Sequence, residues 1–196
     1  YVKSKKILLA FLLLAAYINF AMVPFNVLRP VYVVEVLNLG VEGLSYMGIA
    51  IVVGMITGGY LMGVKGKHVN PITAIGFGLI LFSMMYMLLG VPSYTNFGTN
   101  INIIYAMSIT FLFGFLVPVI NAPMQAAIMK TTSPEMIGRL SSIMGVISLC
   151  AVPLGGVFIS LIGDSISISL LFIIMGLSGL ILSTSFWFAN RHEVIV

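Results

Sequence analysis

Amide side chains recur at helical spacing inside long apolar segments of this chain. Asn19 and Asn26 are seven residues apart, and Asn121 and Gln125 are four apart. Residues at such spacings share one face of a helix. An amide in an apolar medium costs free energy unless it finds a hydrogen-bonding partner. These side chains are therefore expected to face a solute, cavity water or a neighbouring helix.

The functional and the structural interpretation of this amide stripe both stay open at this point. An interhelical hydrogen bond would satisfy each amide and would contribute about 0.6 kcal/mol to the stability of the helix bundle. A solute pathway would also satisfy it, and Met22 beside the stripe would add a soft, adaptable apolar wall. The candidate pathway residues are Asn19, Met22, Asn26, Asn121 and Gln125.

Enzyme chemistry has weak support in the sequence. The segment from Gly176 to Gly179 has the Gly-x-Ser-Gly form of intramembrane serine proteases, with Ser178 as the candidate nucleophile. A serine nucleophile needs a positioned base, but His68 and His192 both lie in polar segments outside the apolar spans and cannot meet Ser178 deep within the last span. The single cysteine, Cys150, cannot form an internal disulfide or a metal cluster. No enzyme activity, catalytic residue, metal or cofactor is predicted.

Six apolar segments must position the candidate residues. The chain has 196 residues, of which 60% are hydrophobic and 7% charged, with a mean hydropathy of +1.18. Soluble domains carry roughly 25% charged residues, so the main solvent of this chain is lipid. Only helices satisfy every backbone amide within such segments. We predict an all-α integral membrane domain, 1–196, with spans at about 7–28, 43–63, 71–91, 101–127, 140–162 and 166–189.

The charged residues predict the orientation of these spans. Eight of the nine basic residues fall at one side of the membrane: Lys3, Lys5, Lys6, Lys65, Lys67, Lys130, Arg139 and Arg191. The other side has Arg29 with Glu35, Glu42 and Asp164. Because basic loops stay in the cytoplasm, both termini are predicted to be cytoplasmic. The short basic clusters between apolar runs do not indicate a nucleic-acid partner.

Small residues four positions apart predict close helix packing. Gly54 and Gly58, Gly59 and Gly63, and Gly156 and Ser160 show this spacing, and Gly176, Gly179 and Ser183 follow one helix face at spacings of three and four. Lipid provides no hydrophobic drive for helix association, so small residues that let backbones approach are common at helix interfaces.

Three motifs resemble one transporter family. Gly59, Leu61, Gly66, Lys67 and His68 fit the cytoplasmic-loop signature of the major facilitator superfamily, although Gly63 and Val64 replace its aspartate and arginine. The segments from Asn121 to Gln125 and from Ser133 through Gly138 to Arg139 resemble the link between the tenth and eleventh helices of that family. The segment from Leu28 to Leu37 is similar to the bacterial macrolide-efflux branch.

The resemblance implies helices seven to twelve of a twelve-helix exporter, arranged as two three-helix inverted repeats. It implies a multi-pass protein of the plasma or inner cell membrane, a drug antiporter that confers antibiotic resistance. Its partners would be the lipid bilayer, an N-terminal six-helix half and a small hydrophobic or amphipathic substrate such as a macrolide. The spans carry no charge, so the other half would supply proton coupling. A small-solute channel or permease is the alternative.

Overall fold

The computed structural model describes residues 6–66, 69–95, 98–163 and 165–190, and within these ranges every regular element is a helix. This confirms the all-α prediction. The elements, in chain order, are α1 (Lys6–Val31), the π-helix η2 (Tyr32–Val36), α2 (Glu42–Lys65), α3 (Pro71–Leu89), the 3₁₀-helix η4 (Val91–Tyr94), α4 (Thr99–Thr131), α5 (Pro134–Ile162) and α6 (Ile168–Asn190).

Six helices in the described part of the chain are long and apolar enough to cross a membrane. Several extend beyond the apolar runs from which they were predicted. Helix α4 continues to Thr131, and α5 begins at Pro134, so Gly138 and Arg139 lie in its first turns and not in a loop. The boundary falls here because Pro134 disfavours helical backbone in the preceding residue and suits the first helical position.

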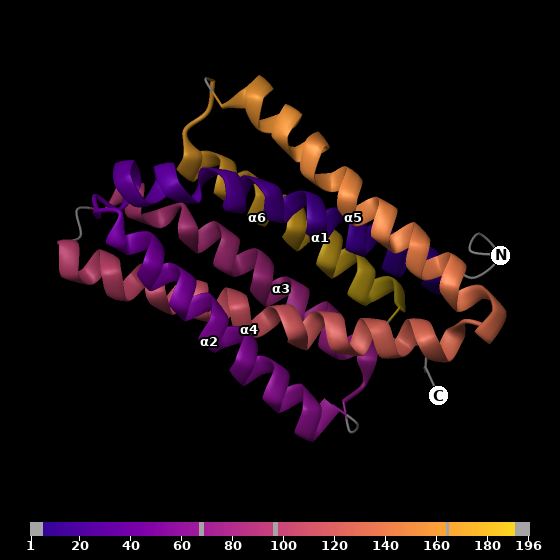
Figure 1. Ribbon diagram of the computed structural model, residues 1–196. Coiled ribbons are helices and arrows are strands. Elements are labelled where there is room, and N and C mark those ends of the chain that lie inside the picture. Colours follow the sequence, from indigo (N-terminus) through magenta and orange to yellow (C-terminus); the bar gives the residue numbers. More distant parts are fainter. Residues whose placement is uncertain (1–5, 67–68, 96–97, 164, 191–196) are drawn as a thin grey trace.

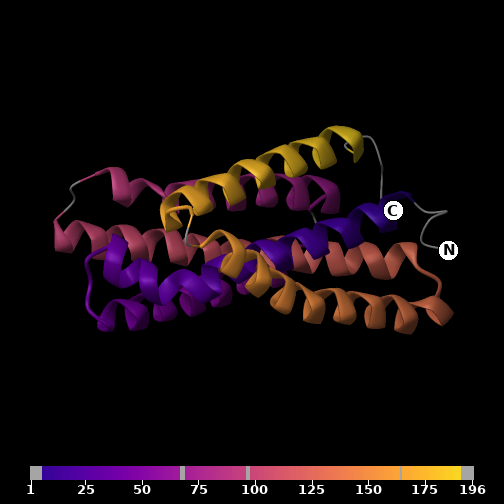
Figure 2. The ribbon, with the colours of Figure 1, turned by 90° about the horizontal axis from the view of Figure 1, so that it is seen from above.

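The six long helices run antiparallel, so α1 begins and α6 ends at the same end of the bundle (Figure 1). We call this the terminal end; it also holds the connections after α2 and α4. The far end holds η2, η4 and the connection between α5 and α6. The main packed pairs are α2 with α4, α3 with α6, α3 with α4, and α1 with α5. Figure 2 shows α5 crossing α1.

Glycines make two of these interfaces close. A Cβ on Gly54 or Gly58 would overlap the backbone carbonyl of Phe111 or Phe115 on α4, and Gly176 likewise meets the backbone of α3 at Ser83. No helix in the described part of the chain packs against Gly59, Gly63 or Gly156, because a Cβ at each would meet no heavy atom of the described residues within 4 Å. Spacing puts such glycines on one face but does not put a partner opposite that face.

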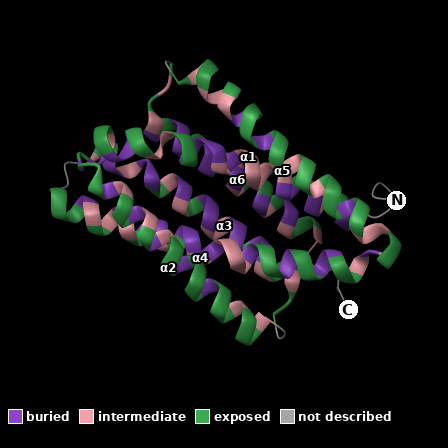
Figure 3. Cartoon of the chain, viewed as in Figure 1, coloured by how far each residue is buried: buried purple, intermediate pink, exposed green. Residues whose placement is uncertain are grey.

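An aromatic cluster fills the far-end side of the bundle core. Phe113 is central, with its ring centroid 5.1 Å from that of Phe25 and 4.2 Å from that of Phe82. The cluster is Phe25, Tyr32, Phe82, Tyr86, Phe113 and Phe172, each at most 4% exposed. Figure 3 shows the buried residues along the middle of the bundle and mostly exposed surfaces on α2 and α5.

Candidate functional site

The central cavity has a volume of about 630 Å³ and lies between the terminal-end halves of α4 and α5, over α1. Its floor on the far-end side is Phe82, a member of the aromatic cluster. Its walls come from four further helices: Ala15, Ile18, Asn19 and Met22 of α1, Met55 of α2, Val117, Ile120, Asn121, Met124 and Gln125 of α4, and Ser141, Met144, Gly145 and Ser148 of α5.

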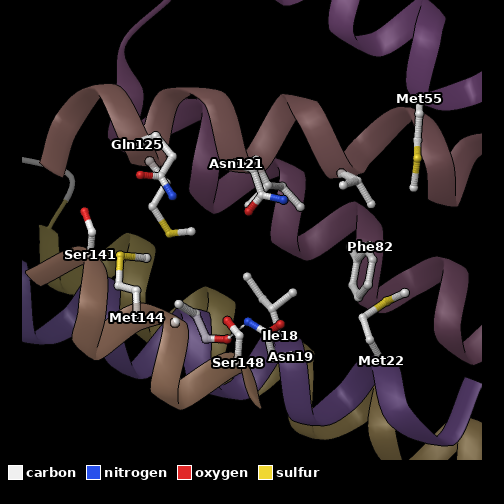
Figure 4. A pocket seen from close by; sticks show the side chains of 15 residues that line it. Ile18, Asn19, Met22, Met55, Phe82, Asn121, Gln125, Ser141, Met144 and Ser148 are labelled. Carbon is white, nitrogen blue, oxygen red and sulfur yellow. Dashed lines mark hydrogen bonds between the residues drawn. The ribbon is translucent and has the colours of Figure 1, made fainter. Parts of the chain in front are cut away.

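Four of the five predicted pathway residues line this cavity. Asn19 and Met22 enter it from α1, and Asn121 and Gln125 project from α4 on the opposite wall (Figure 4). Asn19 donates a hydrogen bond from Nδ2 to the Ala15 carbonyl, 2.8 Å away, which leaves its amide oxygen available. Asn121 and Gln125 are exposed in this chain, as expected of groups at a cavity wall.

Asn26 does not line the cavity. The stripe expected on α1 is divided, because Val23 lies under α5, where it occupies the space a Cβ on Gly155 would need. Asn26 lies beyond this contact and is exposed. The helical period is as predicted, but a neighbouring helix covers the middle of the face.

On α4, the helix face that carries Asn121 continues toward the far end through Gly114 and Thr110, and this part of the face is covered. Thr110 is fully buried and donates to the Ala106 carbonyl of its own helix at 2.7 Å. Gly114 packs against the Ile51 backbone of α2. The cavity therefore begins only after these two residues.

Sequence analysis missed the contribution of α5. Ser141 and Ser148 line the cavity together with Met144 and Gly145. The available signal was their own spacing of seven residues, which puts both serines on one helix face. This spacing alone does not indicate a cavity, because serines often hydrogen-bond within their own helix and then carry no external role.

The cavity combines a few uncharged polar groups with a largely apolar wall. Its polar groups are the amides of Asn19, Asn121 and Gln125 and the hydroxyls of Ser141 and Ser148. Its apolar wall includes four methionines (Met22, Met55, Met124 and Met144), and none of the described residues that line it is charged. Thioethers adapt to irregular apolar surfaces, and a few placed polar groups orient a ligand. The arrangement suits a neutral or weakly polar molecule with a large apolar surface.

The predicted loop-motif residues lie at the terminal end. Gly59 is exposed on α2, and Gly66 follows the last residue of that helix. Gly138 and Arg139 are exposed in the first turns of α5. Lys67 lies outside the described residues. The structure places these groups at one end but on two different helices.

Ser178, the candidate nucleophile, takes part in hydrogen bonds that hold the helices together. Its hydroxyl donates to the Met175 carbonyl at 2.9 Å and lies 2.8 Å from the Tyr17 hydroxyl. Tyr17 also reaches the Met175 carbonyl, at 2.8 Å. These contacts join α1 to α6, which explains a polar pair at this depth without catalysis.

Comparison with known proteins agrees with the geometry. The chain is 25% identical over 174 residues to macrolide efflux protein A of Streptococcus pyogenes, which covers 89% of this chain and 42% of that protein. It is 26% identical over 153 residues to macrolide efflux protein A of Enterococcus faecalis, which covers 78% of this chain and 46% of that protein. The chain thus spans less than half the length of these relatives. No solved structure matches it significantly.

The family assignment rests on most of the chain. The model described as Major Facilitator Superfamily matches residues 1–147, a segment that includes both cavity-forming parts of α1 and α4 and the start of α5. Together with six long apolar helices and no strand among the described residues, this match shows that the chain belongs to the Major Facilitator Superfamily.

Proposed function

We propose that this chain is one half of a secondary transporter that exports amphipathic drugs such as macrolides by alternating access. The observation that carries this proposal is the uncharged cavity, in which amide and hydroxyl groups are set among methionines. Such a wall can bind a large, mostly apolar molecule and still orient its polar groups. The relatives, named as macrolide efflux proteins, support the substrate class.

The other half would be an N-terminal set of six helices. Helix α5 is the least buried span, with 11% of its most apolar window buried. It also presents Gly138, Gly145 and Gly156, where an added Cβ would meet nothing within 4 Å. Small residues on an exposed membrane helix permit close approach of another helix. A second half placed against α5 would cover the open side of the cavity.

The proposed orientation puts the terminal end in the cytoplasm of a cell bounded by a plasma or inner membrane. Its support is the cluster of basic residues at that end, which the positive-inside rule assigns to the cytoplasm. In this orientation the cavity lies on the cytoplasmic side of the aromatic cluster, where an exporter collects its substrate.

A channel is less well supported than a carrier. Phe82 closes the cavity on the far-end side and packs against Phe113, with ring centroids 4.2 Å apart, and both residues are nearly fully buried. A cavity that ends on a packed core needs a conformational change before solute can cross. The hypothesis of a serine protease falls with the family assignment, because members of this superfamily are transporters and not enzymes.

The proposal is tested by efflux of a radiolabelled macrolide from cells that express the full-length protein. Asn121→Leu and Asn26→Leu should each reduce export several-fold while the protein still inserts. Asn26 is proposed to act outside the cavity, where its exposed amide needs a partner beyond the described residues. Thr57→Leu is the control, because Thr57 bonds only to carbonyls of its own helix in the described part of the chain, Val53 at 3.0 Å and Gly54 at 2.9 Å.

Three results would overturn parts of the proposal. Normal export by the Asn121→Leu protein would show that the cavity is not part of the transport pathway. Normal export by the Asn26→Leu protein would reduce that residue to a packing role. Flux that neither saturates nor requires an ion gradient would favour the channel.

A further inference from the structure

A second cavity, of about 360 Å³, lies at the far end where η2, η4 and the start of α4 meet. We call it the far-end pocket. Its polar side chains are those of Glu35, Asn38, Ser93, Thr95 and Asn102. It shares no lining residue with the central cavity. The two sites therefore have different chemistry: the central one is uncharged, and this one contains a carboxylate.

The wall of the far-end pocket is built by an unusual backbone path. Helix α1 continues as the π-helix η2, and Asn38 then adopts a positive φ of 52°. Asparagine tolerates this left-handed conformation better than most residues. The turn is held by the Leu39 amide, which donates to the Val33 carbonyl at 3.0 Å. Tyr32 anchors the same segment through its hydroxyl, 2.7 Å from the Leu89 carbonyl.

Asn102 lines this pocket, and its side chain carries an acceptor without a donor. The residue is 5% exposed, and its Nδ2 donates to the Leu37 carbonyl at 2.8 Å, which fixes the direction of the amide. The opposite atom, Oδ1, is buried and has no hydrogen-bond partner among the described residues. A buried amide oxygen in this state costs free energy until a donor or a cation reaches it.

Glu35 adds the negative charge. It is exposed on η2 and lines both the far-end pocket and an adjoining cavity of about 540 Å³ beside α5 and α6. No ion pair joins Glu35 to a basic residue in the described part of the chain, and the residues that line the pocket include no basic group. Arg29, the basic residue one and a half turns earlier on α1, does not line it.

We propose that the far-end pocket binds a cationic group, either a small inorganic cation such as Na⁺ or the ammonium group of an organic ligand. The Glu35 carboxylate supplies charge, and Oδ1 of Asn102 supplies a neutral oxygen ligand. Hard cations take carboxylate and amide oxygens as ligands, and an ammonium group donates hydrogen bonds to the same atoms. This site is independent of the identity of the exported substrate.

The test measures how cations protect a cysteine in the pocket. Ser93→Cys is introduced into the full-length protein with its native cysteines replaced, and a neutral methanethiosulfonate labels it in detergent. Ser93 is exposed and lines the pocket. Sodium chloride or methylammonium chloride replaces tetraethylammonium chloride, which has no N–H donor, at constant ionic strength. Val41→Cys is the control reporter, because Val41 is 71% exposed and lies outside the pocket.

Protection of S93C but not V41C by Na⁺ alone would assign an inorganic cation. Protection by methylammonium alone would assign an organic ammonium group, and protection by both would assign a general cation site. Glu35→Gln should raise the Kd for the protecting cation at least about tenfold, since a charge-assisted contact is lost. Because Glu35 is exposed, this substitution should not impair folding.

Glu42→Gln is the matched control, because it removes the same charge from the same end of the bundle outside the pocket. This variant should keep the parent Kd. The proposal fails if neither cation protects S93C, if protection survives Glu35→Gln unchanged, or if Glu42→Gln weakens it equally.

Discussion

Ser141 and Ser142 are neighbours on α5, yet only Ser141 lines the central cavity. Ser142 donates to the Gly138 carbonyl of its own helix at 3.0 Å. If the cavity holds substrate, Ser141→Leu removes one neutral hydrogen bond and should raise the KM for export by about 2- to 10-fold. Ser142→Leu should leave KM within about twofold of the parent value. Transport kinetics in inverted vesicles measure both, and equal KM values would exclude Ser141 from the binding wall.

At the scale of the element, two adjacent glycines on α2 differ in how closely they pack against α4. A Cβ on Gly58 would overlap the Phe115 carbonyl of α4, whereas a Cβ on Gly59 would meet nothing within 4 Å. Gly58→Ala should destabilise the fold by about 1–3 kcal/mol through overpacking, and Gly59→Ala should leave thermal stability unchanged. Melting temperatures in detergent compare the two, and a stable Gly58→Ala protein would contradict the described α2–α4 interface.

The pairing of helices bears on the predicted inverted repeats. If α1, α2 and α3 correspond to α4, α5 and α6, a two-fold relation exchanges the pair of α1 with α5 and the pair of α2 with α4, and both pairs are observed. The pair of α3 with α6 maps onto itself. The repeat stays a prediction, and this pattern of contacts supports it.

The orientation of the whole molecule follows from the side at which each connection is accessible. In a cysteine-free background, Val69→Cys at the terminal end should react only with a reagent supplied from the cytoplasm. Tyr94→Cys at the far end, where the side chain is 66% exposed, should react only from outside. The basic residues of the terminal end give the reason. Reversed accessibility would overturn the orientation and, with it, the direction in which the cavity opens.

Proton coupling is the second question at the scale of the molecule. A proton-coupled carrier needs an ionisable group at membrane depth, and no such group among the described residues lines the central cavity. Glu35 and Glu42 lie at the far end, and Glu135 lies at the terminal end, at the start of α5. The 196 residues alone are therefore expected not to drive saturable movement of a hydrophobic dye when a pH gradient is imposed on reconstituted vesicles. Gradient-dependent, saturable dye movement would refute this expectation.

The sequence by itself determined the class of structure. Segments of about 20 apolar residues in lipid can only be helices, because no other backbone conformation satisfies its own hydrogen bonds there. The motif around Gly59 and Gly66 also indicated the family that the comparison then showed. The helical period was sufficient to select Asn19 and Asn121 as members of polar faces.

The tertiary structure decided which of these faces meet. Asn19 and Asn121 are 102 positions apart and line one cavity, while Asn26, seven residues from Asn19, is separated from it where Val23 meets Gly155. Periodicity gives the direction of a side chain around its own helix, but the helix that packs opposite depends on contacts between distant segments. For the same reason, the sequence alone does not predict that Ser141 lines the central cavity or that Asn102, with its unpaired oxygen, lines the far-end pocket.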